Sequence, residues 1–262
     1  MSSSADELIV YCSNVPELIH RIKQSRPNCS EDALIKLGID EGGGSFKITL
    51  QVIIPQTSKS AINGFKESGV KKLFIIALSP DLSEKYCNIL PIWKSLLKLD
   101  DIKSIVAGDL KIINIIVGIM AHSSTNPCPY CEAMKSDLGK ISGLPRSKGS
   151  IKNNSTLKKK AKGKNFASCV NAPLIYGEDE DEILYSCPPP PLHIKLGIVN
   201  TIFKDLEKKY PDWTDLWIQE ADVRQQQRTY GFTGRACHSL LDNTRCLRDN
   251  PELSNYVNVS LL

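Results

Sequence analysis

The sequence lacks any hydrophobic run long enough to cross a bilayer. Its longest apolar stretch, residues 112–121, has 10 residues and is interrupted by Asn114 and Gly118, whereas a transmembrane helix needs about 20. Residues 1–7 also lack the basic and apolar regions of a signal peptide. We therefore expect an intracellular protein that makes no contact with a membrane.

Neither sign of charge dominates the chain, because 33 Lys and Arg residues face 29 Asp and Glu residues and leave a net charge of +4. Such a balance neither requires nor excludes a nucleic-acid partner. The 262 residues are 41% hydrophobic and 24% charged. This composition excludes wholesale disorder and suits one large domain or two small ones.

A disulfide framework is also missing. The nine cysteines are odd in number and thinly spread, and no export signal places them in an oxidising compartment. Only Cys128 and Cys131 lie close together in the sequence. We expect most of the others to be buried thiols that pack as small apolar residues.

The first 140 residues alternate apolar runs with turn signals and predict an α/β domain. Strands are expected at 33–39, 45–54, 72–78 and 101–107. The glycines at 42–44 join the first two as a hairpin. Helices are expected at 84–98, which contains Pro91, and at 110–121. Hairpin-linked strands followed by a helical crossover predict a mixed sheet with flanking helices.

The composition changes twice along the rest of the chain. Residues 141–187 are polar, with eight basic residues between 146 and 164 and an acidic run at 178–182. We expect a charged, flexible insertion there. Residues 188–262 return to helical periodicity, and helices are expected at 192–209, 219–227 and 234–247.

Two aspartates end predicted strands of the same sheet. Asp40 closes the first strand and Asp109 the fourth. Carboxylates at the ends of adjacent strands can hold two divalent ions about 3.5–4 Å apart, as in phosphoryl-transfer enzymes, and their oxygens suit Mg²⁺ or Mn²⁺. The alternative is that both aspartates only favour turns beside glycine.

Cys128 and Cys131 form a Cys-Pro-Tyr-Cys motif. Two thiolates at this spacing can bind one tetrahedral Zn²⁺, which then needs two more ligands. The candidates for these ligands, none with a diagnostic spacing, are His122, Cys169, Cys187 and His193. The alternatives are a redox pair, although no thioredoxin-like segment precedes the motif, and two unrelated loop cysteines.

Lysines cluster in the polar segment, where no acidic residue lies between 146 and 164. The densest part is formed by five of them: Lys158, Lys159, Lys160, Lys162 and Lys164. Clustered cations can contact the phosphates of nucleic acid or an import receptor. No aromatic residue lies among these lysines before Phe166, so base stacking is not indicated. The alternative is a solvated loop.

Four segments together resemble eukaryotic cut-and-paste DDE transposases, and within them the group that includes Transib and the V(D)J recombination-activating recombinase. LGIDEGGGSFKITL (37–50) resembles the first-aspartate motif and VAGDLKIINIIVGI (106–119) the second. CPYCE (128–132) resembles the CxxC that follows, and PLHIKLGIVN (191–200) the downstream helical segment. The order and spacing of all four over about 160 residues make the resemblance more specific than any single motif.

The resemblance implies a nuclear protein with a ribonuclease-H-like core that cuts and joins DNA with two Mg²⁺ ions. Asp40 and Asp109 would be metal ligands, and Cys128 and Cys131 would be half of a structural zinc site. The implied parts are a helical lead-in at 1–30, the core at 31–140, the charged insertion at 141–187 and an incomplete helical segment at 188–262.

The chain departs from the family's pattern at the third carboxylate, which is a glutamate on a late helix. No residue can be assigned to it, because Glu207 and Glu220 come too early. We therefore expect a transposase-derived DNA-binding protein without strand-transfer activity, unless an intact transposase or another protein partner supplies the missing helices. The alternatives are a zinc-stabilised DNA- or protein-binding module and a decayed transposon fragment without a selected role.

Overall fold

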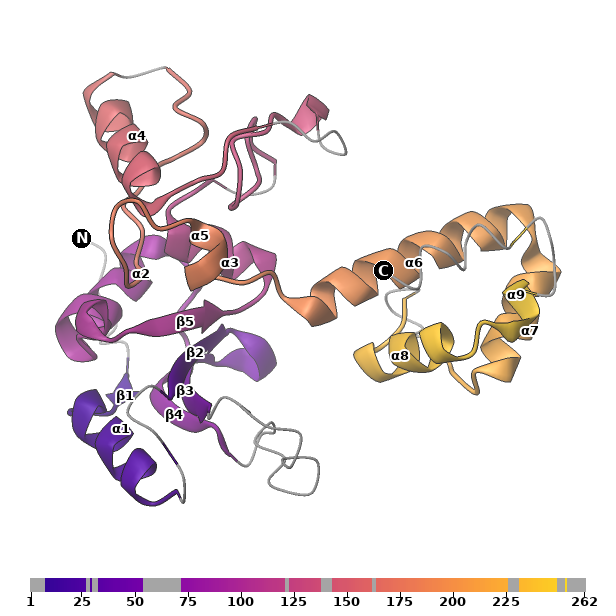
Figure 1. Ribbon diagram of the computed structural model, residues 1–262, viewed down its shortest axis with the longest axis horizontal. Coiled ribbons are helices and arrows are strands. Elements are labelled where there is room, and N and C mark those ends of the chain that lie inside the picture. Colours follow the sequence, from indigo (N-terminus) through magenta and orange to yellow (C-terminus); the bar gives the residue numbers. More distant parts are fainter. Residues whose placement is uncertain are drawn as a thin grey trace. The chain divides into compact units, whose positions relative to one another are not determined.

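A computed structural model describes residues 8–26, 29, 33–53, 72–120, 123–137, 143–161, 164–225, 231–248 and 253 of the chain. The chain forms two compact units, Met1–Pro189 and Pro190–Leu262 (Figure 1). Each unit has its own cluster of buried hydrophobic side chains. None of the described helices is both long and apolar enough to cross a membrane.

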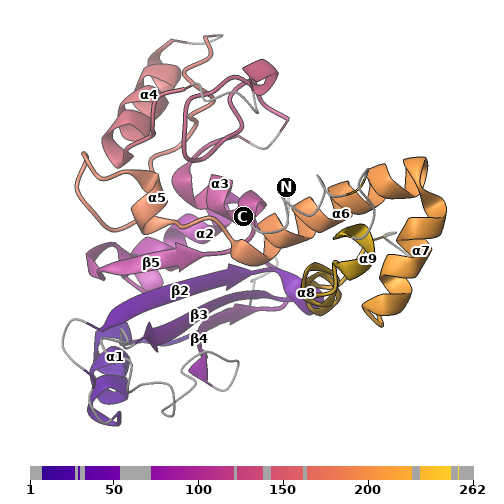
Figure 2. The ribbon, with the colours of Figure 1, turned by 45° about the vertical axis from the view of Figure 1, so that its right-hand side comes forward.

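The first unit is α/β, as the sequence predicts. Its mixed sheet has five strands in the order β1-β4-β3-β2-β5 (Figure 2). The strands are β1 (Val10–Tyr11), β2 (Leu34–Asp40), β3 (Phe46–Ile53), β4 (Phe74–Ser79) and β5 (Ser104–Ala107). β5 runs parallel to β2, whereas the other pairings of these strands are antiparallel. The four predicted strands are confirmed, and the short β1 is one that the sequence did not indicate.

The β2–β3 hairpin positions the first aspartate. Side chains of a strand point alternately to its two faces, and four alternating residues of β3 are fully buried: Phe46, Ile48, Leu50 and Val52. The hairpin stays in register from Leu34 opposite Ile53 to Asp40 opposite Lys47. Burial of one face of β3 sets the register of this strand with β2. The same register therefore positions Asp40 at the end of β2.

Helices cover the sheet and connect its strands. Those of the first unit are α1 (Val15–Gln24), α2 (Tyr86–Pro91), α3 (Leu110–Val117), α4 (Lys148–Lys160) and α5 (Ile183–Ser186), with 3₁₀ turns at Gly42–Gly44, Leu99–Asp101 and Lys135–Asp137. The helix predicted over 84–98 is confirmed over residues 86–96, but it is an α-helix only as far as Pro91. Proline lacks the N–H group that an α-helix needs, and a π-helical turn, Ile92–Leu96, follows Pro91 directly.

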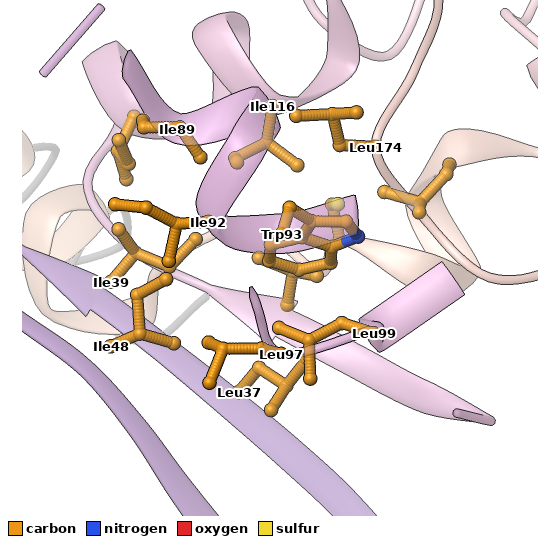
Figure 3. Close-up of a cluster of buried hydrophobic side chains, with 14 of the residues drawn as sticks. Leu37, Ile39, Ile48, Ile89, Ile92, Trp93, Leu97, Leu99, Ile116 and Leu174 are labelled. Carbon is orange, nitrogen blue, oxygen red and sulfur yellow. The ribbon is translucent and has the colours of Figure 1, made fainter. Parts of the chain in front are cut away.

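Trp93 lies at the centre of the core of the first unit. Its side chain is fully buried, and Figure 3 shows it between Leu37 of β2 and Ile116 of α3. Leu174 reaches the same cluster from the charged segment (Figure 3). The core is thus built from parts of the chain that are far apart in sequence.

The segment 141–187 contains more structure than the sequence predicts. Ser147 and Ser150 exchange hydrogen bonds as a capping box at the start of α4. Six residues of the segment are fully buried: Arg146, Ile151, Cys169, Leu174, Ile183 and Cys187. The prediction of a flexible insertion is therefore wrong for these residues. Their spacing shows no periodicity because they meet only in the folded structure.

The second unit is helical. It contains α6 (Pro191–Lys209), α7 (Pro211–Glu220), α8 (Gly234–Asp242) and α9 (Arg245–Arg248). Trp217 is fully buried, and its Nε1 donates a hydrogen bond to the Leu240 carbonyl at 3.0 Å. The prediction of a helix over 219–227 is wrong for its described part, 219–225, because α7 ends at Glu220 and Asp222 adopts a left-handed φ of 49°.

Candidate functional site

Asp40 is the last residue of β2, and Asp109 lies two residues after the end of the neighbouring strand β5. The last paired residues of β2 and β5 are Gly38 and Ala107, which lie two positions before the two aspartates in the sequence. Neighbouring strands are about 4.8 Å apart. The structure therefore brings the two predicted acids to adjacent strand ends on the same edge of the sheet.

Gly108 lets the chain turn from β5 into α3 at this edge. A Cβ at position 108 would lie 2.0 Å from Ile112 Cγ2 and 3.3 Å from the Ile39 carbonyl oxygen. Since real Cβ contacts are not this short, a side chain here would displace the start of α3. The absence of a side chain at Gly108 is thus what keeps Asp109 beside the end of β2.

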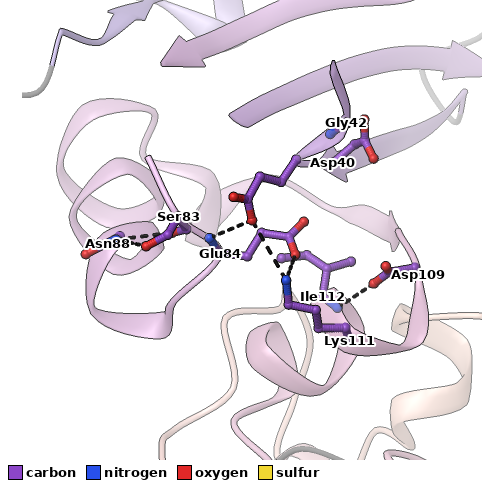
Figure 4. Close-up of polar contacts among 9 residues, drawn as sticks. Asp40, Gly42, Ser83, Glu84, Asn88, Asp109, Lys111 and Ile112 are labelled. Atoms are coloured by element: carbon purple, nitrogen blue, oxygen red, sulfur yellow. Dashed lines mark hydrogen bonds and ion pairs between the residues drawn. The ribbon is translucent and has the colours of Figure 1, made fainter. Parts of the chain in front are cut away.

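Each aspartate is held by local contacts (Figure 4). Asp40 Oδ2 accepts a hydrogen bond from the Gly42 N–H at 2.9 Å and lies 3.7 Å from Lys47 Nζ. Asp109 caps α3, because its Oδ1 accepts a hydrogen bond from the Ile112 N–H at 2.7 Å. Both carboxylates are therefore oriented by their own neighbourhoods.

Three more charged residues gather at the same edge. Glu84 is almost buried, with a side chain 6% exposed, and its Oε2 lies 2.7 Å from Lys111 Nζ. Glu41 Oε2 accepts a hydrogen bond from the Glu84 N–H at 3.1 Å and lies 3.8 Å from Lys111 Nζ. The hydrogen bond to Glu84 raises the pKa of Lys111, and the charges of Glu84, Glu41 and Asp109 raise it further. The positive charge at this edge of the sheet is thus the ammonium group of Lys111, which lies against Glu84 and Glu41.

Sequence reasoning missed these three residues. Glu41 directly follows Asp40, and Lys111 lies two residues after Asp109, but neither has a spacing that assigns it to the site. Glu84 lies just before α2, at the start of a predicted helix, and helical periodicity does not mark a residue as part of a site. Among the residues that the structure describes, no three His, Cys, Asp or Glu side chains are grouped closely enough to hold a metal ion.

The loop of Cys128 and Cys131 forms a second candidate site. Burial raises the pKa of the Cys128 thiol, the N–H of Tyr130 lowers it, and a hydrogen bond with the Cys131 thiol raises it further. The side chains of Cys128 and Cys131 thus influence each other within one loop. Thiols are ligands that a structural zinc site uses.

The buried side chain of Arg146 holds this loop by hydrogen bonds to its backbone. Its side chain is fully buried. Its Nε donates hydrogen bonds to the carbonyls of Cys128 at 3.0 Å and Cys131 at 2.9 Å. Its remaining contacts are with the carbonyl of Asn126 at 3.3 Å, the carbonyl of Ala167 at 2.8 Å and Cys169 Sγ at 3.3 Å. The sequence grouped Arg146 with the solvated basic residues, and no pattern marked it as buried.

The other predicted zinc ligands do not join this pair within the described part of the chain. Cys169 is held by Arg146, and Cys187 is fully buried, which raises its pKa to about 12. His122 lies outside the described residues, as does the side chain of His193. The eight cysteines whose side chains are described are all free thiols.

The predicted lysine cluster falls at the end of α4. Lys158, Lys159 and Lys160 form the last turn of this helix, and Lys164 follows it, whereas Lys162 lies outside the described residues. Lys159, Lys160 and Lys164 are exposed, and Lys158 Nζ lies 3.4 Å from Met120 Sδ.

No protein-family model matches the chain, and no curated protein matches it.

Proposed function

We propose that the first unit is a ribonuclease-H-like, transposase-type domain that binds DNA in the nucleus without cutting it. The observation that carries the proposal is the place of Asp40 and Asp109, directly after the paired parallel ends of β2 and β5. The sheet around them, with β3 and β4 antiparallel, has the mixed form that the sequence resemblance implies.

Local contacts at this edge oppose the binding of a metal ion, and therefore oppose metal-dependent cleavage of DNA. The ammonium group of Lys111 already lies against Glu84 and Glu41, and a fixed positive charge opposes the approach of a metal cation. Asp40 and Asp109 are both engaged by backbone N–H groups. Each of these hydrogen bonds occupies one oxygen of its carboxylate, so a divalent ion would have to bind the other oxygen or displace the bond.

The affinity for DNA would come from the lysines at the end of α4. Exposed cations neutralise phosphates and release the counterions of DNA, so binding of this kind weakens steeply with salt. Lys159, Lys160 and Lys164 are exposed and form such a cluster.

Two assays test the proposal together. Fluorescence anisotropy with a labelled duplex measures binding across a salt series, and conversion of supercoiled plasmid in Mg²⁺ or Mn²⁺ measures nicking. We expect salt-dependent binding, no nicking, and unchanged binding by Asp40→Asn and Asp109→Asn. Asparagine at 109 keeps a side-chain oxygen that can cap α3. Nicking that disappears in Asp109→Asn would show an active nuclease, and binding that is absent at low salt would remove the DNA-binding role.

We also propose that Cys128 and Cys131 supply two ligands of a structural Zn²⁺. Both lie in one loop, and Arg146 holds both of their carbonyl groups. The ion would cross-link this loop to ligands elsewhere in the chain or in a partner.

A further inference from the structure

The acidic run 178–182 is a closed turn packed on the start of α4. The Glu178 N–H donates a hydrogen bond to Asp181 Oδ2 at 2.8 Å. The Asp179 carbonyl accepts a hydrogen bond from the Gly149 N–H at 2.7 Å, and the Asp181 carbonyl accepts one from the Lys148 N–H at 3.0 Å. We call residues 178–182 the acidic turn.

Side chains fix the acidic turn to the first half of α4. Lys152 Nζ lies 3.3 Å from Asp179 Oδ2, and Lys148 Nζ donates to the Gly177 carbonyl. A Cβ on Gly149 would lie 2.8 Å from the Asp179 carbonyl oxygen, so only glycine permits this approach. Both lysines in the first half of the helix are therefore engaged by the turn or by the residue that precedes it.

The other end of α4 carries the opposite charge. We call Lys158, Lys159, Lys160 and Lys164 the basic end. Within the described chain, Lys159, Lys160 and Lys164 form no ion pair with a carboxylate. Lysines in the last turn of a helix are also favoured by the helix dipole. The 13 residues of α4 span about 20 Å at the rise of an α-helix.

α4 is held firmly on the body of the first unit. Ile151 and Ser155 of α4 are buried, and Asn154 Nδ2 donates a hydrogen bond to Glu132 Oε1 at 3.4 Å. The acidic turn and the basic end therefore keep a fixed separation.

We propose that the basic end binds the phosphates of duplex DNA and that the acidic turn excludes phosphates from the first half of α4. DNA then crosses the helix at its C-terminal end and does not run along it. The inference rests on the proposed DNA binding and adds where, and in which direction, the DNA lies.

The range of the acidic turn depends on salt. The Debye length is about 30 Å at 0.01 M salt and about 8 Å at 0.15 M, compared with a separation of about 20 Å along the helix. At low salt the turn should weaken binding at the basic end itself. At physiological salt it should repel only phosphates that come close to it.

The first measurement identifies the DNA contacts. In the basic-end variant, Lys158, Lys159 and Lys160 are changed to Gln. Its control carries Lys195→Gln, Lys204→Gln and Lys208→Gln at exposed positions of α6. We expect the slope of log K against log salt to fall by about 1 for each lysine that contacts a phosphate. The control, with the same change in charge, should keep the slope of the unmodified protein.

The second measurement isolates the acidic turn. Its variant carries Glu178→Gln, Glu180→Gln and Glu182→Gln, which leave the contacts of Asp179 and Asp181 in place. Its control carries Glu207→Gln, Asp212→Asn and Asp215→Asn, three exposed acids of the second unit. We expect the acidic-turn variant to bind about fivefold more tightly than this control at about 0.02 M salt and less than about twofold more tightly at 0.15 M.

The outcomes separate this inference from the proposed function. If the unmodified protein shows no salt-dependent binding, the proposed function fails and the inference fails with it. If DNA binds but the basic-end variant behaves as its control, the inference is wrong while DNA binding stands. If the acidic-turn variant binds no more tightly than its control at low salt, the acidic turn does not repel DNA phosphates. That part of the inference is then wrong. Circular dichroism of every variant confirms that it is folded.

Discussion

Among single residues, Arg146 is the one whose role is least visible in the sequence. Its guanidinium group has no exposed surface and meets five acceptors, four of them backbone carbonyls. Arginine presents its donors in a rigid planar fork, whereas lysine offers one compact ammonium group. The loop of Cys128 and Cys131 therefore depends on the shape of this side chain as much as on its charge.

We expect Arg146→Lys to lower the free energy of unfolding by about 3 kcal/mol, because buried carbonyls lose their donors and a buried charge loses partners. Chemical denaturation monitored by circular dichroism measures the change. Lys159→Met, at an exposed position of the same segment, is the control and should change stability by less than about 0.5 kcal/mol. An Arg146→Lys protein as stable as the control would show that the fork is dispensable.

Lys111 balances the almost buried carboxylate of Glu84. Replacing Lys111 with Met should cost about 1–2 kcal/mol, because Glu84 is left without its cation. Lys94→Met is the matched control, since it removes an ion pair with Asp100 whose side chains are 52% and 40% exposed and which contributes little. Equal stability of the two variants would contradict this role for Glu84.

The stability difference between the unmodified protein and Lys111→Met should decrease at high pH. The pKa of Lys111 in the folded protein is raised above its ordinary value of 10.5, so its contribution to stability is complete below that value and is lost as pH rises through the folded pKa. The stability difference between the unmodified protein and Lys111→Met should be constant from about pH 7 to 9 and shrink above about 10.5. Urea denaturation across this range measures it.

At the scale of elements, regular patterns in the sequence predicted regular structure. The alternation of Phe46, Ile48, Leu50 and Val52 predicted β3, because burial of one face of a strand has the same period as the sequence. The charged segment behaved differently. Its acidic turn and α4 are joined by backbone hydrogen bonds between residues about 30 positions apart, and no local pattern records such contacts.

The sequence predicted only those residues of the candidate sites that lie in short motifs. Asp40, Asp109, Cys128 and Cys131 stand out because short motifs carry them. Glu84 does not, because it approaches Lys111 only after α2 and α3 have packed on the sheet. Tertiary contacts of single residues leave no period and no spacing.

The Cys128–Cys131 loop makes a prediction of its own. We expect the purified protein to bind about one equivalent of Zn²⁺, and Cys128→Ser or Cys131→Ser to lose most of it. Chelation should lower the Tm of the unmodified protein, because metal binding stabilises only the folded state. Metal analysis and thermal melts measure both effects. Cys87→Ser, at an exposed cysteine outside the loop, is the control, and a loop variant that retains as much zinc as this control would exclude the loop as a ligand.

On the scale of the whole molecule, each unit has its own buried cluster. We expect residues 1–189 to fold alone and to unfold in one cooperative transition. A chain ended at residue 173 is the control, because it loses four buried residues of the same core: Leu174, Ile175, Ile183 and Cys187. Thermal unfolding followed by circular dichroism should be cooperative for the first chain only. A fragment 1–189 that melts without cooperativity would show that the first unit needs the second.

The fixed separation of the acidic turn and the basic end also gives α4 and the turn packed on it an electric dipole. In the field of a polyanion, such a body rotates before it makes contact, so that its positive pole arrives first. This rotation changes the rate at which productive encounters occur and leaves the lifetime of the complex to the contacts themselves. Gly149 lets the negative pole lie directly on the helix. If the proposed DNA binding holds, this residue contributes to the rate of association although it does not contact the DNA.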